Sequence, residues 1–161
     1  MTPETDSGRR LFRHTLAAVA YRGGKTLRDA GSDFATFRAG ESCRTSLEIL
    51  AHMGDLFEWA LSIARGKETW RNAETRDWDQ EVKRFFATLK AFDDYLASAE
   101  PLNCPPENLF QGPIADSLTH VGQLAMLRGL AGNPIRGENY FKADIAAGRV
   151  GAEQSAPRGE F

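Results

Sequence analysis

Residues 45–66 read TSLEILAHMGDLFEWALSIARG and carry the clearest folding signal in the chain. Thr45 and Glu48 have the spacing of a capping box, in which the threonine hydroxyl accepts a hydrogen bond from the third helical N–H and the glutamate bonds back. Ser42 is an alternative cap, and Gly66 suits the position just beyond a helix C-terminus. Apolar residues between these ends recur at helical spacing: Leu47, Ile49, Leu50, Met53, Leu56, Phe57, Leu61 and Ile63. We therefore expect an amphipathic helix with one broad buried face.

Three further segments show the same helical periodicity, at about residues 7–30, 77–98 and 113–131. Asp93 and Asp94, near the end of the second of these, are expected on the solvent side. No stretch alternates apolar and polar residues over a useful strand length. Four amphipathic helices without a sheet predict an all-α four-helix bundle.

The connections between these helices have unequal lengths, so a simple up-and-down topology does not follow from the sequence. Residues 31–40 and 67–76 are expected to be loops, and prolines at 101, 105 and 106 predict a long loop before the last helix. A short extra helix is expected at about residues 140–147. We expect one bundle domain over residues 1–148 and a Gly-rich, partly disordered tail over residues 149–161.

Composition sets outer limits on function. The chain has 161 residues, enough to bury a core without a disulfide or a metal as a staple. The net charge of −2 argues against a nucleic-acid partner, which usually requires a basic excess, and favours a small-molecule partner. No apolar run is long enough to cross a membrane, and the first ten residues lack the apolar core of a secretory signal. Two distant cysteines, Cys43 and Cys104, are expected to be reduced thiols in a cytoplasmic protein.

The chain contains only three histidines, and two of them fall where a helix bundle can build a metal site. Asp116 and His120 are four residues apart, so they project from one face of a helix. His52 lies midway along the helix quoted above, and together the three form a two-histidine, one-carboxylate set. Other interpretations stay open: Asp116 suits a first helical turn without any metal, and His52 suits a hydrogen-bonded boundary position. His14 has no evident partner and is expected to be structural.

Two segments of the chain resemble the DinB/YfiT-like superfamily of metal-binding four-helix bundles. Residues 115–124, ADSLTHVGQL, are similar to its last-helix signature, and residues 46–59, SLEILAHMGDLFEW, to its second helix. The resemblance spans roughly residues 10–132. It implies that His52, Asp116 and His120 hold a divalent ion such as zinc, nickel, manganese or iron. The chain has Asp116 where the typical member has histidine, and a carboxylate favours harder ions.

The resemblance also implies a function. Members are similar to bacterial low-molecular-weight-thiol transferases and maleylpyruvate isomerases, so we expect a metal-dependent thiol transferase or hydrolase acting on a small molecule in stress or detoxification. Glu48, Asp55 and Glu138 are candidate bases, and the sequence does not select among them. Gln123 is expected either to hydrogen-bond a ligand or to fill a helix contact, and Trp59 to line a pocket beside the metal.

Two alternatives belong to other classes of protein. One is a metal-binding module that senses or stores an ion without catalysis. The other is an interaction protein whose bundle dimerises and whose polar pocket is vestigial. Whatever the function, the superfamily's habit and exposed aromatic residues lead us to expect a homodimer.

Overall fold

The computed structural model describes residues 3–161, without the side chains of residues 3–6 and 32. Its long helices are α1 (Pro3–Leu27), α3 (Ser46–Ala64), α4 (Trp78–Ala97) and α6 (Ala115–Leu130). Shorter elements are α2 (Ser32–Ala35), α5 (Pro106–Leu109), the π-helical η1 (Phe110–Ile114) and the 3-10 turn η2 (Tyr140–Lys142). The prediction of an all-α fold is confirmed for the described chain.

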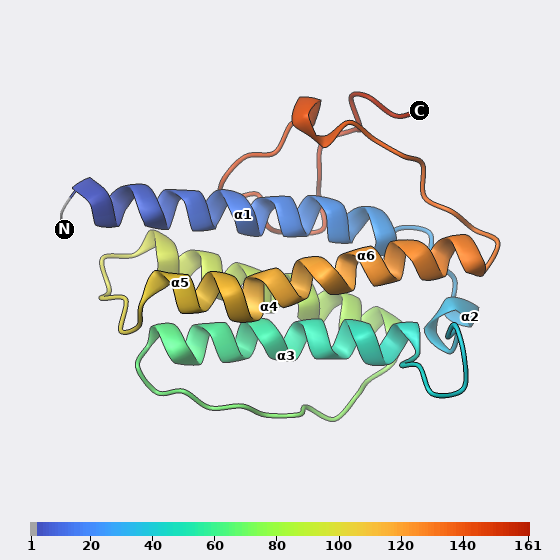
Figure 1. The fold of residues 1–161 in the computed structure, drawn as a ribbon, viewed down its shortest axis with the longest axis horizontal. Helices are drawn as coiled ribbons and strands as arrows, with labels where there is room; N and C mark the ends of the chain where they lie inside the picture. Colours follow the sequence, from blue (N-terminus) through green and yellow to red (C-terminus); the bar gives the residue numbers. More distant parts are fainter. Residues whose placement is uncertain (1–2) are drawn as a thin grey trace.

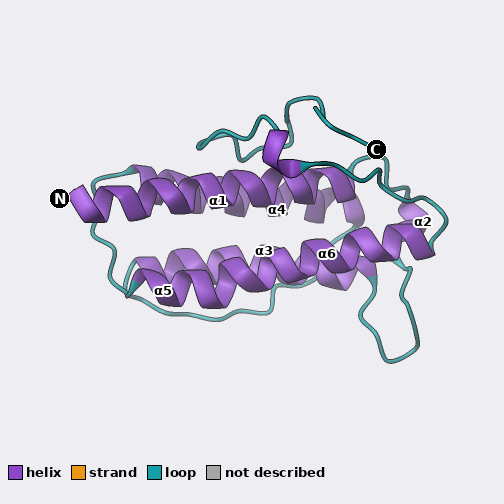
Figure 2. Cartoon of the chain, turned by 45° about the horizontal axis from the view of Figure 1, so that its top comes forward, coloured by secondary structure: helices purple, strands orange, loops and turns teal. Residues whose placement is uncertain are grey.

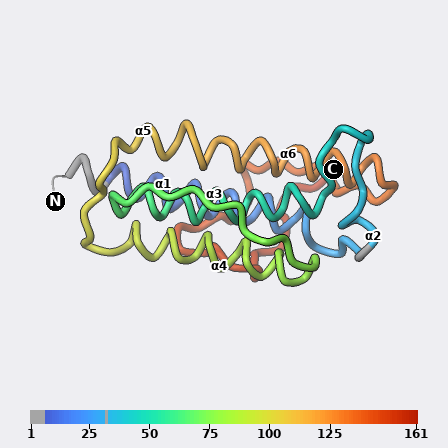
Figure 3. Tube along the Cα trace, turned by 90° about the horizontal axis from the view of Figure 1, so that it is seen from below, coloured from blue at the N-terminus to red at the C-terminus, as the bar shows by residue number. Residues whose placement is uncertain are grey.

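The long helices lie side by side around one core (Figure 1). α4 and α6 each contact both α1 and α3, and they lie on opposite sides of the α1–α3 pair when the molecule is seen from below (Figure 3). α1 and α6 run in one direction, and α3 and α4 run in the other. The two parallel neighbours α3 and α4 are therefore joined by a loop, residues 65–77, that runs back along the length of α3 (Figure 1).

The ends of α3 form as the sequence predicts. The Thr45 hydroxyl accepts a hydrogen bond from the Glu48 N–H, and the Glu48 carboxylate accepts one from the Thr45 N–H. Gly66, just beyond the helix, has φ of 72°, a conformation that glycine adopts without steric cost. α4 begins similarly, because the Asp77 carboxylate accepts from the Gln80 N–H. These caps fix the start of both helices.

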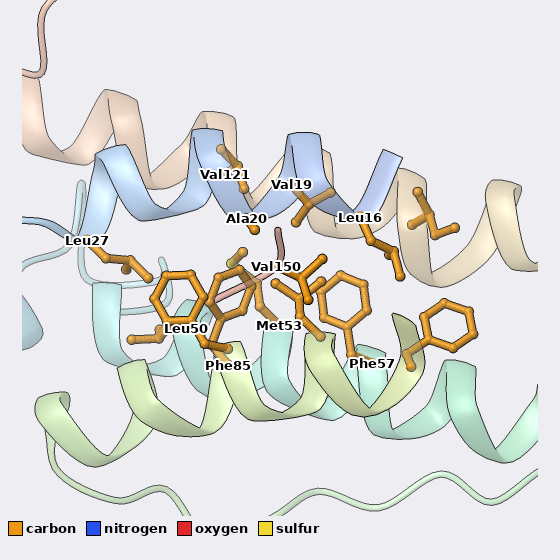
Figure 4. Packing of buried hydrophobic residues seen from close by; sticks show 14 of the residues in the cluster. Leu16, Val19, Ala20, Leu27, Leu50, Met53, Phe57, Phe85, Val121 and Val150 are labelled. Atoms are coloured by element: carbon orange, nitrogen blue, oxygen red, sulfur yellow. The ribbon is translucent and has the colours of Figure 1, made fainter. Parts of the chain in front are cut away.

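The core draws side chains from all four long helices (Figure 4). Leu16, Leu50, Phe57, Phe85 and Leu124 are fully buried. Phe57 and Phe85 meet edge to face with ring centroids 6.1 Å apart, a favourable aromatic geometry. Burying each such side chain contributes about 1.5–3 kcal/mol, so this core is a main source of the stability of the bundle.

Several details of the expected fold are wrong. Asp93 is buried rather than solvated, because Arg13 on α1 binds its carboxylate at 2.9 Å. The expected loop at residues 31–40 contains α2. The expected long loop before the last helix ends early, because Pro106 starts α5 from the first turn, where a missing N–H costs nothing.

The last long helix begins close to Pro113, as expected. α5, η1 and α6 follow one another along the chain (Figure 2), but Gly112 has a non-helical backbone (φ −89°, ψ −105°) that kinks the path before Pro113. Asp116 therefore lies in the first turn of α6, the position that the sequence predicts. The expected short helix at residues 140–147 is reduced to η2, because Ala143 adopts an extended backbone that ends it.

The C-terminal segment crosses over α1 (Figure 1). Val150 is buried in the core, and Glu160 forms an ion pair with Lys25 at 2.8 Å. Glu138 and Glu160 also form an isolated antiparallel bridge. Residue 148, the expected domain boundary, thus lies within a segment that contacts the helices both before and after this residue. None of the described helices combines the length and the apolar character needed to cross a membrane.

Candidate metal centre

His52, Asp116 and His120 meet where α3 packs against α6. His52 comes from the middle of α3, while Asp116 and His120 lie one turn apart on α6. The ligand atoms of the three residues all lie within 4.8 Å of one another. The helix spacing and the contact of two elements distant in sequence therefore bring together the set expected from the sequence.

Asp116 lies between the two imidazoles. One carboxylate oxygen is 3.5 Å from His52 Nε2, and the other is 3.4 Å from His120 Nε2. Ligand atoms about 2.1 Å from a tetrahedral ion lie about 3.4 Å from each other. These two spacings match that value, so small side-chain rotations would bring the donor atoms onto one ion. The group could hold a metal ion.

The second nitrogen of His120 has a partner of its own. His120 Nδ1 lies 2.7 Å from Gln123 Oε1. An amide oxygen only accepts, so Nδ1 carries the hydrogen and donates it, which leaves the lone pair on Nε2. A partner of this kind orients many metal-binding histidines. Of the two roles left open for Gln123, the structure shows the hydrogen bond to His120, one of the candidate ligands.

His52 lies in an environment that keeps it neutral. Burial, the Arg44 charge and His120 lower its pKa, and the Asp116 carboxylate opposes them only in part. The imidazole therefore holds no second proton at pH 7 and has a lone pair to offer. The two rings meet edge to face with centroids 5.0 Å apart.

The centre is buried on one side and open on the other. The side chain of His120 is 9% exposed and that of His52 19%, whereas that of Asp116 is 45% exposed. Within the described chain, no arginine or lysine lies within ion-pair distance of Asp116. The carboxylate is therefore not neutralised by a fixed cation, and solvent or a small molecule reaches the group from its side.

Aromatic residues cover the flank formed by α3. Trp70, from the loop after α3, contacts the His52 ring at 5.6 Å between centroids, and Trp59 contacts Trp70 at the same distance. The expectation that Trp59 lines the site directly is thus modified, since Trp70 is the residue against His52. Its position depends on the path of a loop, which helical periodicity does not reveal.

The three candidate bases are each held by other groups. Glu48 completes the α3 capping box, which lowers its pKa through the Thr45 backbone hydrogen bond. Asp55 is buried in an ion pair with Arg84 on α4. Glu138 is buried against α1 and hydrogen-bonded to Tyr21 and Lys25, at 2.7 and 2.8 Å. Their place in catalysis stays a prediction, and none of them has a hydrogen bond or ion pair to the three candidate ligands.

Two further residues, His14 and Arg44, lie outside the group of candidate ligands. His14 is exposed on α1, outside the ligand group. Arg44, whose charge lowers the pKa of His52, was missed in the sequence, because it precedes the α3 cap without any periodic or motif signal.

Comparison of the chain with protein-family models, with curated proteins and with solved structures finds no match.

Proposed function

We propose that His52, Asp116 and His120 hold a divalent metal ion and that the chain is a metal-dependent enzyme of the DinB-like superfamily. The observation that carries the proposal is a single carboxylate facing the Nε2 atoms of two histidines from different helices. Two imidazoles and one carboxylate suit zinc, nickel, manganese or iron, with positions left for water or a substrate.

The proposed reaction is transfer or hydrolysis of a small molecule, with a low-molecular-weight thiol as one candidate substrate. A bound divalent ion would lower the pKa of a water or thiol so that it acts as a nucleophile near neutral pH. The chain's own residues would orient the ligands and restrict access. Gln123 fixes the His120 tautomer, and Trp70 covers one side, leaving entry past the exposed edge of Asp116.

A second candidate, a metal-binding module without catalysis, is favoured by one observation. Glu48, Asp55 and Glu138 each have a structural partner, so none is a free base beside the ligands. A hydrolase can dispense with a separate base only if the ion alone activates the water. The third candidate, a dimeric interaction protein, stays a prediction, as does the homodimer itself.

The proposal is tested by assaying the metal-loaded protein against a panel of esters, amides and thiol acceptors. We expect turnover that disappears in His52→Ala and His120→Ala and persists in His14→Ala, which removes a histidine outside the group. Metal binding without turnover of any panel member would favour the module. Turnover that survives both ligand substitutions would contradict the enzyme proposal.

A further inference from the structure

A cavity of about 360 Å³ lies beside the candidate metal centre, between the segment before α3 and the second half of α6. It shares His120 and Gln123 with the centre. The rest of its wall consists of Ala39, Cys43, Arg44, Ile49, Met126 and Leu127. Its volume is within the range of small-molecule pockets. Three other cavities of the molecule are lined by none of the three candidate ligands.

Arg44 gives this cavity its charge. No aspartate or glutamate lines the wall, and within the described chain Arg44 makes no hydrogen bond or ion pair. Other arginines of the bundle are engaged: Arg13 binds Asp93, and Arg84 binds Asp55. A guanidinium with its donors unused in a cavity wall fits a planar anion such as a carboxylate, which it binds in bidentate geometry.

Most of the remaining wall is apolar. Ile49 and Leu127 belong to the core and present only their edges, at 4% and 3% exposure. Met126 is 59% exposed, an unusual state for a large apolar side chain that lines a cavity. An apolar ligand body placed here would cover Met126 and remove its surface from water.

We propose that this cavity is the substrate pocket of the centre and takes a small carboxylic acid with an apolar body. Arg44 would bind the carboxylate, and Ile49, Met126 and Leu127 would contact the body. The orientation of the substrate, whose reacting part would face His120, rests on the proposed function. Binding of the carboxylate itself needs only Arg44 and the cavity.

The test uses hexanoate and its uncharged analogue hexanamide as probes of the full chain, in EDTA, followed through the ¹³C methyl signals of methionine. The Met126 signal, assigned by Met126→Leu, should shift with hexanoate. The signal of Met53, which is fully buried in the core, serves as the internal control. We expect hexanamide to bind about fivefold more weakly, the scale of one exposed charge pair.

Paired variants separate the role of Arg44 from that of net charge. Arg44→Gln should weaken hexanoate binding about fivefold and leave hexanamide unchanged. Arg38→Gln removes an equal charge from the same segment, outside the cavity, and should leave both affinities within about twofold. Equal binding of the two probes, an unshifted Met126 signal, or equal losses in both arginine variants would overturn the inference.

A second titration with saturating Zn²⁺ distinguishes the two proposals. If the protein takes up no zinc but Arg44-dependent hexanoate binding persists, the pocket stands and the proposed metal function fails. If zinc binds to the three ligands and hexanoate does not bind with or without it, the substrate assignment fails and the metal centre stands.

Discussion

At the scale of single residues, metal binding at the candidate centre depends on which ring nitrogen of His120 has an available lone pair. Gln123 Oε1 accepts from Nδ1 at 2.7 Å, so the lone pair of Nε2 faces Asp116. Without this partner the ring is free to change tautomer or to rotate. The contribution of Gln123 is therefore to orientation rather than to ligation.

Substituting Gln123→Leu should lower zinc affinity about tenfold, the usual effect of losing a partner that orients a metal ligand. Competition with a chromophoric chelator measures the change. Gln80→Leu, an exposed glutamine on α4, is the matched control and should leave affinity unchanged. If the two variants bind zinc equally well, Gln123 does not orient the ligand.

Asp116 is the residue at which the candidate centre departs from the pattern of the DinB-like superfamily that the sequence resembles. Asp116→His should preserve or raise the affinity for zinc and nickel, because imidazole suits both ions. Asp116→Ala should lower affinity more than Gln123→Leu does, because it removes a donor atom. Titration calorimetry with each ion supplies the measurement. Affinities unaltered by both substitutions would mean that Asp116 is not a ligand.

At the scale of elements, the start of α3 sets the register of His52. Thr45 and Glu48, which form the capping box, lie seven and four residues before His52. Thr45→Ala should lower the free energy of unfolding by about 1 kcal/mol, because it leaves the Glu48 N–H without its acceptor. Urea unfolding followed by circular dichroism measures this.

Thr119→Ala on α6 is the control for this cap. The Thr119 hydroxyl bonds only to the carbonyl one turn before it, and the side chain is exposed. Its removal should be neutral or slightly stabilising, because alanine has the higher helix propensity. A loss from Thr119→Ala as large as that from Thr45→Ala would mean that the cap contributes nothing specific.

The helices and loops also differ in how well the sequence predicts them. Periodicity and capping place α1, α3, α4 and the centre of α6 within a few residues, because each helix buries one apolar stripe. Periodicity also places Asp116 and His120 on one face of α6 and His52 midway along α3, and the resemblance to the DinB-like superfamily singles these three out as candidate ligands. Trp70, Arg44 and the Asp93–Arg13 pair are not predicted, because their positions depend on loop paths and on which helix lies opposite. Local spacing carries no information on either.

At the scale of the whole molecule, the C-terminal segment is joined to α1 by a buried polar cluster. Glu138 accepts hydrogen bonds from Tyr21 and Lys25, and Lys25 also pairs with Glu160. Burial raises the pKa of Glu138, but the hydrogen bonds from Lys25 and Tyr21 outweigh it and leave the pKa below its ordinary value. The cluster thus stabilises the fold while Glu138 is ionised.

This coupling predicts a pH dependence. A carboxyl whose pKa is lower in the folded chain stabilises it fully above the unfolded pKa, and the stabilisation is lost as pH falls through the folded pKa. Glu138→Gln should therefore cost about 2 kcal/mol at pH 7, with a smaller difference from wild type near pH 3. Unfolding series at both pH values measure this, with exposed Glu153→Gln as the control. A difference that does not depend on pH would contradict the role of the Glu138 charge.

The most direct test of the metal centre is the metal content of the purified chain, by mass spectrometry of protein equilibrated with zinc, nickel, manganese and iron and then desalted. We expect about one ion per wild-type chain, from one set of three ligands, and an equal content in His14→Ala. His52→Ala and His120→Ala should each retain far less. A wild-type chain without metal, or variants that keep the full content, would contradict the assignment of His52, Asp116 and His120 as ligands.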